Sequence, residues 1–288
     1  MDLITLRRSL EAENYIFDEE FLITVHIALK LGKPLLIEGA AGVGKTEVAK
    51  VLASALGVEL IRLQCYEGLD ESKALYEWNY QKQLLSIQAG LAAKANLSDL
   101  YSKEYLLERP LLKAINSETS NVLLIDEIDK SDEEFEAFLL EVLSDFQVSI
   151  PELGTIKAKS RPVIILTSNN TRQLSDALRR RCIYLFLNYP DVEKEIRIIN
   201  AKLPGVPERL AKDAASAVSY LRQNSRVYKK PSVAETLDWV SSLLAMDKNR
   251  LDEDGISKTL GLLIKNREDM LEIRKDEGFS ELLDKKPR

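Results

Sequence analysis

Histidine and cysteine are nearly absent from this sequence. Among 288 residues there is one histidine, His26, and there are two cysteines, Cys65 and Cys182. Two cysteines cannot build a disulfide framework, and a single histidine excludes a metal site made of histidines. Long apolar runs are missing too, since none approaches the roughly 20 residues that a membrane helix needs, and no apolar signal sequence stands at the start. We therefore expect a cytoplasmic protein with reduced thiols and no membrane partner.

A strong excess of charge of either sign is also missing. The 46 acidic and 40 basic side chains leave a net charge of −6. This balance argues against a dominant basic surface for nucleic acid, although it leaves a local basic patch open. With 45% apolar and 30% charged residues, the composition is that of a globular protein with one large domain or two ordinary ones.

Five short apolar segments predict an α/β fold. Because they alternate with helical patterns and are apolar on both faces, they fit a parallel sheet covered by helices on both sides. The expected strands are Pro34–Glu38, Glu59–Gln64, Asn121–Asp126, Pro162–Ser168 and Cys182–Leu187.

Two helices and a hairpin can also be placed in this first part of the chain. We expect helices over Thr46–Leu56 and Asp132–Leu143, the second opened by a capping box of Ser131 and Glu134. A hairpin is expected over residues 148–158, where VSI and TIKA alternate around the turn residues PELG.

After Pro190 the pattern changes to helices alone. Residues 191–203 and 208–222 have helical spacing, and Ser232 with Glu235 forms a second capping box. We predict two domains, an α/β domain over 1–190 and a small helical domain over 191–288.

A phosphate-binding loop is the strongest motif. The sequence GAAGVGKT fits G-x-x-x-x-G-K-[ST] and lies between an expected strand and an expected helix. Glycines let backbone N–H groups converge on phosphate, the lysine contacts the β- and γ-phosphates, and the threonine binds Mg²⁺. The predicted nucleotide-binding residues are Gly39, Ala40, Ala41, Gly42, Val43, Gly44, Lys45 and Thr46, with Thr46 also a metal ligand.

Polar residues follow two other expected strands. Asp126 and Glu127 end the strand VLLID, where the first would hold Mg²⁺ through water and the second would orient and polarise the attacking water. Asn169 ends the strand VIILTS and would hold the water or sense the γ-phosphate, or it forms a plain Asn-Asn turn. The neighbouring Asp129 and Lys130 are expected at the surface or in a cap.

Three consecutive arginines, Arg179, Arg180 and Arg181, precede the last strand. A guanidinium on the developing charge accelerates phosphoryl transfer, but such a run can also be a solvated basic face. Cys182 beside them is either a low-pKa thiol or, more simply, an inert strand residue. The aromatic residues Tyr76, Trp78 and Tyr80 fit packing or protein contact better than base stacking, given the acidic residues around them.

In their order along the chain, these motifs resemble the AAA+ ATPases. The segments LIEGAAGVGKTEVAK, IDEIDKSDEEFEAFLLEVLSD and TSNNTRQLSDALRRRCIYLFL, together with LQCYEGLD, ERPLLKAI and IPELGTIKA, resemble the MoxR group and its small CoxD-like branch. The resemblance implies a P-loop AAA+ core, with a five-stranded parallel sheet between helices, and a helical lid domain. It also implies ATP and Mg²⁺ as ligands and a ring, usually a hexamer.

The resemblance also implies roles for further residues. Asn169 matches the sensor residue, and Arg181, with Arg180 as the alternative, matches the arginine finger that acts on a neighbouring subunit. An insert within about residues 66–90 and the hairpin over 148–158 would face a pore or a client. Relatives often have an arginine at the start of a lid helix, which the segment over residues 229–235 lacks, so Arg226 or Lys230 substitutes or sensing by the lid is weak.

These expectations favour an ATP-hydrolysing chaperone that remodels or matures a client protein, such as a metal-cofactor enzyme, together with a von Willebrand A-domain partner. Two alternatives stay open. One is an AAA+ ATPase acting on nucleic acid, and the other is a nucleotide-gated binding module with little turnover.

Overall fold

We describe the protein from a computed structural model, which defines residues 1–88, 100–151 and 153–275. The chain divides into two compact units. The first comprises Met1–Ser9, Asp18–Gly39 and Lys45–Phe186, and the second comprises Leu10–Phe17, Ala40–Gly44 and the chain from Leu187 onward. Within the described residues, no helix is long and apolar enough to cross a membrane.

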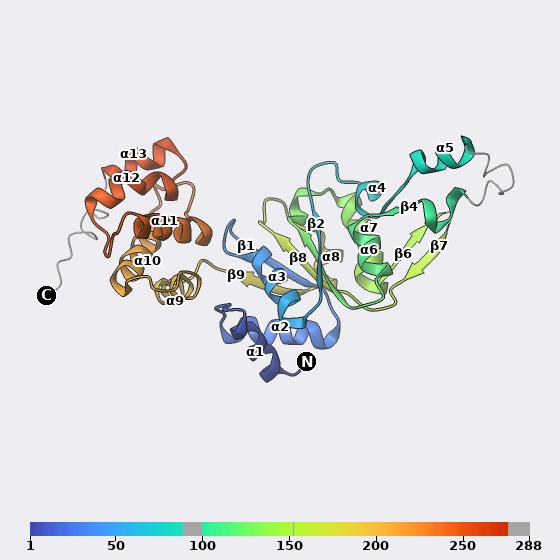
Figure 1. The fold of residues 1–288 in the computed structure, drawn as a ribbon, viewed down its shortest axis with the longest axis horizontal. Helices are drawn as coiled ribbons and strands as arrows, with labels where there is room; N and C mark the ends of the chain where they lie inside the picture. The colour runs from blue at the N-terminus through green and yellow to red at the C-terminus, as the bar shows by residue number, and fades with distance from the viewer. Residues whose placement is uncertain (89–99, 152, 276–288) are drawn as a thin grey trace. The chain divides into compact units, whose positions relative to one another are not determined.

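A five-stranded sheet in the order β2-β5-β8-β1-β9 forms the centre of the first unit (Figure 1). The pairs β2/β5, β5/β8 and β8/β1 are parallel, and every residue of β5 is buried, as expected for a strand covered on both faces. This confirms the predicted α/β fold and its strands. The strands are β1 (Leu35–Gly39), β2 (Glu59–Gln64), β5 (Asn121–Asp126), β8 (Val163–Ser168) and β9 (Ile183–Leu187).

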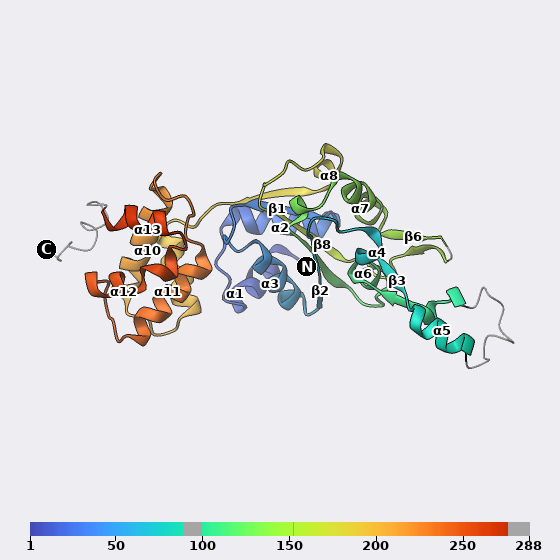
Figure 2. The same cartoon turned by 90° about the horizontal axis from the view of Figure 1, so that it is seen from above.

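Helices cover both faces of this sheet. Leu123 and Ile125 of β5 share a core cluster with the helices that precede and follow that strand, whereas no residue of the P-loop helix α3 belongs to that cluster. Figure 2 shows α7 and α8 on one side of the strands and α3 on the other. Apart from two helices in the segment between β2 and α6, the helices of this part of the chain are α1 (Leu3–Ala12), α2 (Glu19–Leu31), α3 (Lys45–Leu56), α6 (Pro110–Asn116), α7 (Glu133–Asp145) and α8 (Asp176–Arg181).

The start of α7 differs from the prediction. Asp132, not Ser131, is the N-cap, and its carboxylate accepts the Phe135 N–H at 2.8 Å. Ser131 instead donates its hydroxyl to the Ile128 carbonyl and ends the short 3-10 turn η4 (Ile128–Lys130). Both residue types cap helices well, so the sequence SDEE alone does not decide between them. The predicted capping box at Ser131 and Glu134 is therefore wrong.

Two small antiparallel sheets are added to the central one. Between β2 and β5 lie α4 (Glu71–Ala74), β3 (Tyr76–Trp78), α5 (Tyr80–Gln88), η3 (Lys103–Tyr105) and β4 (Leu106–Glu108), with β3 paired to β4. After α7, β6 (Gln147–Ile150) pairs with β7 (Gly154–Lys157), at the place where the sequence predicts a hairpin. Figures 1 and 2 both show α5 and the β6/β7 hairpin at the same end of the first unit.

The second unit is built from helices around a core of its own. Trp239 is fully buried there, and its Nε1–H donates to Thr259 Oγ1 at 2.7 Å. The capping box of Ser232 and Glu235 predicted for α11 is present. The helices are α9 (Val192–Lys202), α10 (Glu208–Gln223), α11 (Val233–Ala245), α12 (Glu253–Leu263) and α13 (Arg267–Arg274).

Candidate nucleotide site

The loop from Gly39 to Thr46 leaves the end of β1 and enters α3. Gly42 and Gly44 have φ of 76° and 98°, a backbone conformation that favours glycine. Lys45 is 6% exposed, and its Nζ donates to the Gly39 carbonyl at 2.8 Å. Burial lowers the pKa of Lys45, and the carboxylates of Asp129, Asp126 and Glu127 oppose that change. The loop thus presents an ammonium group and helix N-terminal N–H groups, the donors that phosphate needs.

Thr46 and Asp126 are brought together as the sequence predicts for a metal-binding pair. Thr46 Oγ1 lies 3.1 Å from Asp126 Oδ1, although the two residues are 80 positions apart in the chain. Asp126 is 2% exposed and also accepts the hydroxyl of Thr167 at 2.5 Å. A hydroxyl and a carboxylate are hard oxygen donors, and two protein ligands leave room for phosphate and water, which Mg²⁺ retains. These residues therefore fit Mg²⁺ that arrives with a nucleotide.

Glu127 has its carboxylate placed by contacts from three segments. It accepts Gln64 Nε2 at 2.9 Å and Asn169 Nδ2 at 3.2 Å, and it pairs with Lys130 Nζ at 2.6 Å. Its backbone is left-handed, with φ of 56° and ψ of 49°, which is costly for a residue with a side chain. Its N–H donates to Thr167 Oγ1 at 2.9 Å. The carboxylate is thus held beside the Thr46–Asp126 pair by residues of β2, η4 and the β8 end.

Asp129 is buried, which corrects the expectation that it lies at the surface or in a cap. It is 4% exposed, and its carboxylate accepts the N–H of Asn169 at 3.1 Å, the N–H of Thr171 at 3.0 Å and the Thr171 hydroxyl at 2.6 Å. Two residues beyond Glu127, it ties the loop after β8 to the loop after β5. Asn169 therefore reaches Glu127 from a loop that Asp129 fixes.

The three arginines of α8 have different surroundings. Arg179 pairs with the buried Glu38 at 3.1 Å, and its guanidinium lies 5.4 Å from the centre of the Tyr184 ring. Arg181 Nε donates to Ser144 Oγ at 2.6 Å, and its Nη1 donates to its own helix. The Arg180 side chain is exposed and makes no hydrogen bond or ion pair with any described residue. Nor does any of the three bond to residues 39–46 or 126–127 within the described chain.

Comparison with known proteins identifies the family. The model of the AAA domain (dynein-related subfamily) matches residues 34–182, just over half of the chain. The chain belongs to this AAA family. The matched range contains the phosphate loop, Asp126, Glu127, Asn169 and the three arginines.

The other similarities are more distant. Over 226 residues the chain is 26% identical to a Lon protease of Elusimicrobium minutum, covering 71% of this chain and 24% of that protein. A Lon protease of Cytophaga hutchinsonii is 29% identical over 189 residues, covering 62% of this chain and 20% of the relative. The chain thus spans about a quarter or less of these relatives.

Solved structures of Thermotoga maritima RuvB share the fold. One point mutant of that protein has a TM-score of 0.52 at 23% identity, covering 88% of this chain and 73% of that one. A second point mutant has a TM-score of 0.50 at 21% identity, covering 88% of this chain and 72% of that one. At this identity the likeness shows the AAA+ fold alone.

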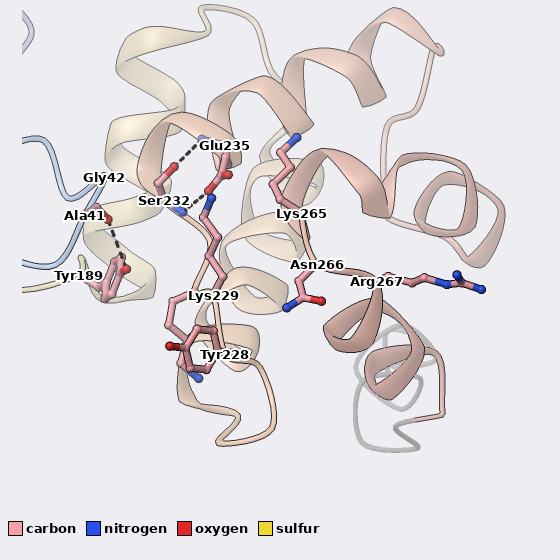
Figure 3. A pocket seen from close by; sticks show the side chains of 11 residues that line it. Ala41, Gly42, Tyr189, Tyr228, Lys229, Ser232, Glu235, Lys265, Asn266 and Arg267 are labelled. Carbon is pink, nitrogen blue, oxygen red and sulfur yellow. Dashed lines mark hydrogen bonds between the residues drawn. The ribbon is translucent and has the colours of Figure 1, made fainter.

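The helical unit of this AAA protein contains a cavity of about 810 Å³ (Figure 3). Tyr189, whose hydroxyl donates to the Ala41 carbonyl at 3.4 Å, lies at one side. Lys230 lines this cavity, and its Nζ donates to the Asn224 carbonyl at 2.5 Å, whereas Arg226 lines a neighbouring cavity. The cavity is lined by Ala41, Gly42, Tyr189, Tyr228, Lys229, Lys230, Ser232, Glu235, Lys265, Asn266 and Arg267.

Neither cysteine has the surroundings of a reactive thiol. Burial raises the pKa of Cys65 to about 12, with Asp126, Asp129 and Glu127 adding to the effect. Burial also raises the pKa of Cys182 to about 12, although the charge of Arg181 opposes it. Because the thiolate is the reactive form, the interpretation of Cys182 as an inert residue fits the structure and the low-pKa alternative does not.

Four residues of this site are not among the site residues that the sequence predicts. Gln64, Arg62, Thr167 and Lys130 contact Glu127 or Asp126. Gln64 carries the same signal as Asn169, a polar residue at the carboxyl end of an apolar strand. The sequence does not give the order of the strands in the sheet, so it does not show that Gln64 lies near Glu127. In the structure β2 lies next to β5, although 56 residues separate Gln64 from Asn121.

Proposed function

We propose that this AAA protein is a MoxR-type ATPase that hydrolyses ATP with Mg²⁺ and uses the cycle to remodel a partner protein. The observation that carries the proposal is the placement of Glu127. It is held by Gln64 and Asn169 beside the Thr46–Asp126 pair, close to a loop whose lysine is buried and donates to the loop backbone. A carboxylate base beside a metal pair and a phosphate loop is the arrangement that phosphoryl transfer to water requires.

The residues divide the chemistry between them. Lys45 and the loop N–H groups from Gly39 to Thr46 bind the phosphates, and Thr46 and Asp126 hold Mg²⁺, which neutralises phosphate charge when bound. Glu127 accepts a proton from the attacking water, and Asn169 orients that carboxylate or the water. Because hydrolysis builds charge on the phosphoryl oxygens, an additional guanidinium from outside this chain completes the site.

We further propose that the guanidinium is Arg181 of a neighbouring copy in a ring, with Arg180 as the alternative. Arg181 is exposed and lies on α8, and within the described chain it makes no hydrogen bond to the phosphate loop or Glu127. A ring, expected to be a hexamer, would bring Arg181 of one copy to the nucleotide site of the next. The Arg180 side chain has the simpler surroundings of the two, since it makes no hydrogen bond or ion pair with the described residues.

A protein client is supported by one end of the first unit. There α5 exposes Leu84, Leu85 and Ile87, at 58%, 65% and 47%, and the β6/β7 hairpin lies at the same end (Figure 1). Exposed apolar side chains at this density mark interaction surfaces more often than solvent faces. We propose that this end contacts a client, such as a metal-cofactor enzyme, and that a von Willebrand A-domain protein and a cytoplasmic location belong to the same system.

The test is the substitution Glu127→Gln. It keeps the shape of the side chain and removes the base, so we expect ATP to bind with near wild-type affinity and hydrolysis to fall by about 10²- to 10⁴-fold. Binding of a fluorescent nucleotide and phosphate release are measured side by side. In the presence of ATP, this variant should not release its client protein, so the client should co-purify with it. Hydrolysis at the wild-type rate would contradict the assignment of the base.

A second candidate, an ATPase acting on nucleic acid, is favoured by the cavity of the helical unit. Its lining combines four cationic side chains with two tyrosines, the chemistry that binds single strands (Figure 3). Stimulation of hydrolysis by DNA or RNA that falls steeply with salt would support it. The absence of such stimulation, together with stimulation by a client, would support the chaperone.

A further inference from the structure

Arg62 is a cation placed at the carboxylate that the proposed function gives to Mg²⁺. It lies on β2, where it pairs in register with Leu124 of β5, two residues before Asp126. Its Nη2 is 2.5 Å from Asp126 Oδ2. The Asp126 side chain is 3% exposed, whereas that of Arg62 is 50% exposed. A buried carboxylate needs compensating charge, and Arg62 supplies part of it through this ion pair, beside the charge of Lys45.

A second contact fixes the arginine in this position. The same Nη2 lies 2.5 Å from Gln64 Oε1, two residues along β2 on the same face. Gln64 in turn donates its Nε2 to Glu127. Arg62 therefore sits between the metal-binding carboxylate and the amide that holds the catalytic one, with half of its side chain exposed to solvent.

Mg²⁺ and this guanidinium compete for the same carboxylate. Asp126 Oδ1 accepts the Thr167 hydroxyl at 2.5 Å and the Thr46 hydroxyl at 3.1 Å. Arg62 Nη2 donates to the other oxygen, Oδ2. A divalent cation held by Thr46 and Asp126 would add positive charge at the carboxylate that Arg62 already pairs with, and like charges in a partly buried site repel. Each cation would therefore weaken the hold of the other on Asp126.

We infer that Arg62 is a displaceable counter-ion of Asp126 and that it sets how strongly Mg²⁺ promotes nucleotide binding. The inference rests on the proposed function, because it needs Asp126 to receive Mg²⁺ with a nucleotide. Without metal, Arg62 neutralises Asp126 and lets the phosphates approach. With metal, the ion pair between Arg62 and Asp126 is weakened, and that loss is subtracted from the gain that Mg²⁺ brings.

The experiment measures binding of a fluorescent ADP analogue to the full chain in EDTA and across a Mg²⁺ titration. In Arg62→Gln, we expect weaker binding in EDTA, because Asp126 loses its ion-pair partner, and a lower Mg²⁺ concentration at half-effect. The ratio of the two dissociation constants, EDTA over saturating Mg²⁺, should rise about tenfold, the size of one charge-assisted hydrogen bond. Arg62→Lys keeps the charge and should stay near the wild-type ratio.

The matched control is Arg109→Gln. Arg109 has a similarly exposed side chain, 45%, and it pairs with Glu77 on β3 of the β3/β4 sheet. Its loss should leave the ratio unchanged. The inference is overturned if Arg62→Gln behaves like this control, or if it reduces the effect of Mg²⁺, which would mean that Arg62 contacts the nucleotide.

Failure of the proposed function has a different signature in the same experiment. Lys45→Ala removes the lysine of the phosphate loop and should bind no nucleotide. If the wild-type chain binds as little as this variant, with or without Mg²⁺, the proposed function fails and the inference fails with it. If the wild type binds and Mg²⁺ strengthens the binding, the result for Arg62→Gln decides the inference alone.

Discussion

At the scale of single residues, the buried carboxylate of Asp129 decides where Asn169 lies. It accepts two backbone N–H groups and one hydroxyl from the loop after β8, and that loop carries Asn169. Its partners lie in that loop and not in the Thr46–Asp126 pair, so its role is to position another residue. Asp129 therefore acts mainly by placing Asn169, although its charge also acts on Lys45.

We predict that Asp129→Asn lowers the rate of ATP hydrolysis while the affinity for nucleotide stays within about threefold, because an amide accepts fewer and weaker hydrogen bonds than a carboxylate. The free energy of unfolding should fall by about 1–3 kcal/mol at pH 7. Phosphate release, nucleotide titration and urea denaturation measure the three quantities. Weaker nucleotide binding in step with the rate would contradict a positioning role.

The same variant has a defined pH dependence. Burial pushes the pKa of Asp129 upward, but hydrogen bonds from Thr171 and Asn169 outweigh it and leave the pKa below its ordinary value of 3.8. A carboxylate with a lowered pKa stabilises the folded state above its unfolded value, and this contribution is lost as pH falls through the folded value. The stability difference between wild type and Asp129→Asn should be constant near neutral pH and shrink below about pH 4.

At the scale of elements, the helices of the second unit are joined by a buried ion pair. Arg222 of α10 makes two hydrogen bonds to Glu195 of α9, at 2.8 and 3.1 Å, and both side chains are at most 5% exposed. Its Nε also donates to the Pro231 carbonyl just before α11. One side chain thus links three helices, and its removal would leave Glu195 charged and buried.

We predict that Arg222→Gln destabilises the helical unit by about 3–5 kcal/mol, the cost of leaving a buried charge unpaired. Arg209→Gln is the control on the same helix, because Arg209 pairs with Asp213 at 3.8 Å on the surface. Its effect should stay below about 1 kcal/mol. Chemical denaturation followed by Trp239 fluorescence reports the difference, and equal effects of the two variants would contradict the prediction.

The sequence predicts the elements better than it predicts the contacts between them. Strands β1, β5 and β8 follow from runs that are apolar on both faces, β2 alternates between apolar and polar residues, and helix α11 begins where its capping box indicates. The cap of α7 is predicted one residue early because Ser131 and Asp132 are equally good candidates side by side. Gln64 and Arg62 escape prediction because their partners come from the β5 end, and the order of strands in a sheet is a long-range property.

At the scale of the whole molecule, the chain lacks one group that its proposed reaction needs. No arginine of α8 bonds to the phosphate loop or to Glu127 within the described chain, although one of them is the proposed finger. Mixing therefore offers a direct test, because a chain defective in its own site can still lend its arginine to a neighbour.

We predict that Lys45→Ala and Arg181→Ala are each inactive in ATP hydrolysis and that a mixture of the two regains part of the wild-type rate. In mixed assemblies an intact phosphate loop of one chain faces an intact Arg181 of the other. Phosphate release is measured over a range of mixing ratios, with size-exclusion chromatography confirming co-assembly. If co-assembled chains stay inactive, the arginine does not act between subunits.

The charged groups gathered around Asp126 and Glu127 have a consequence for how a nucleotide is attracted. Lys45, Arg62 and Lys130 bring three positive charges, and Asp126, Glu127 and Asp129 bring three negative ones. At rest the site is formally neutral, within a protein whose net charge is −6. Long-range attraction therefore does little to draw in an anionic ligand. Selection for nucleotide has to be made at hydrogen-bond range, by the shape of the loop and the direction of its donors.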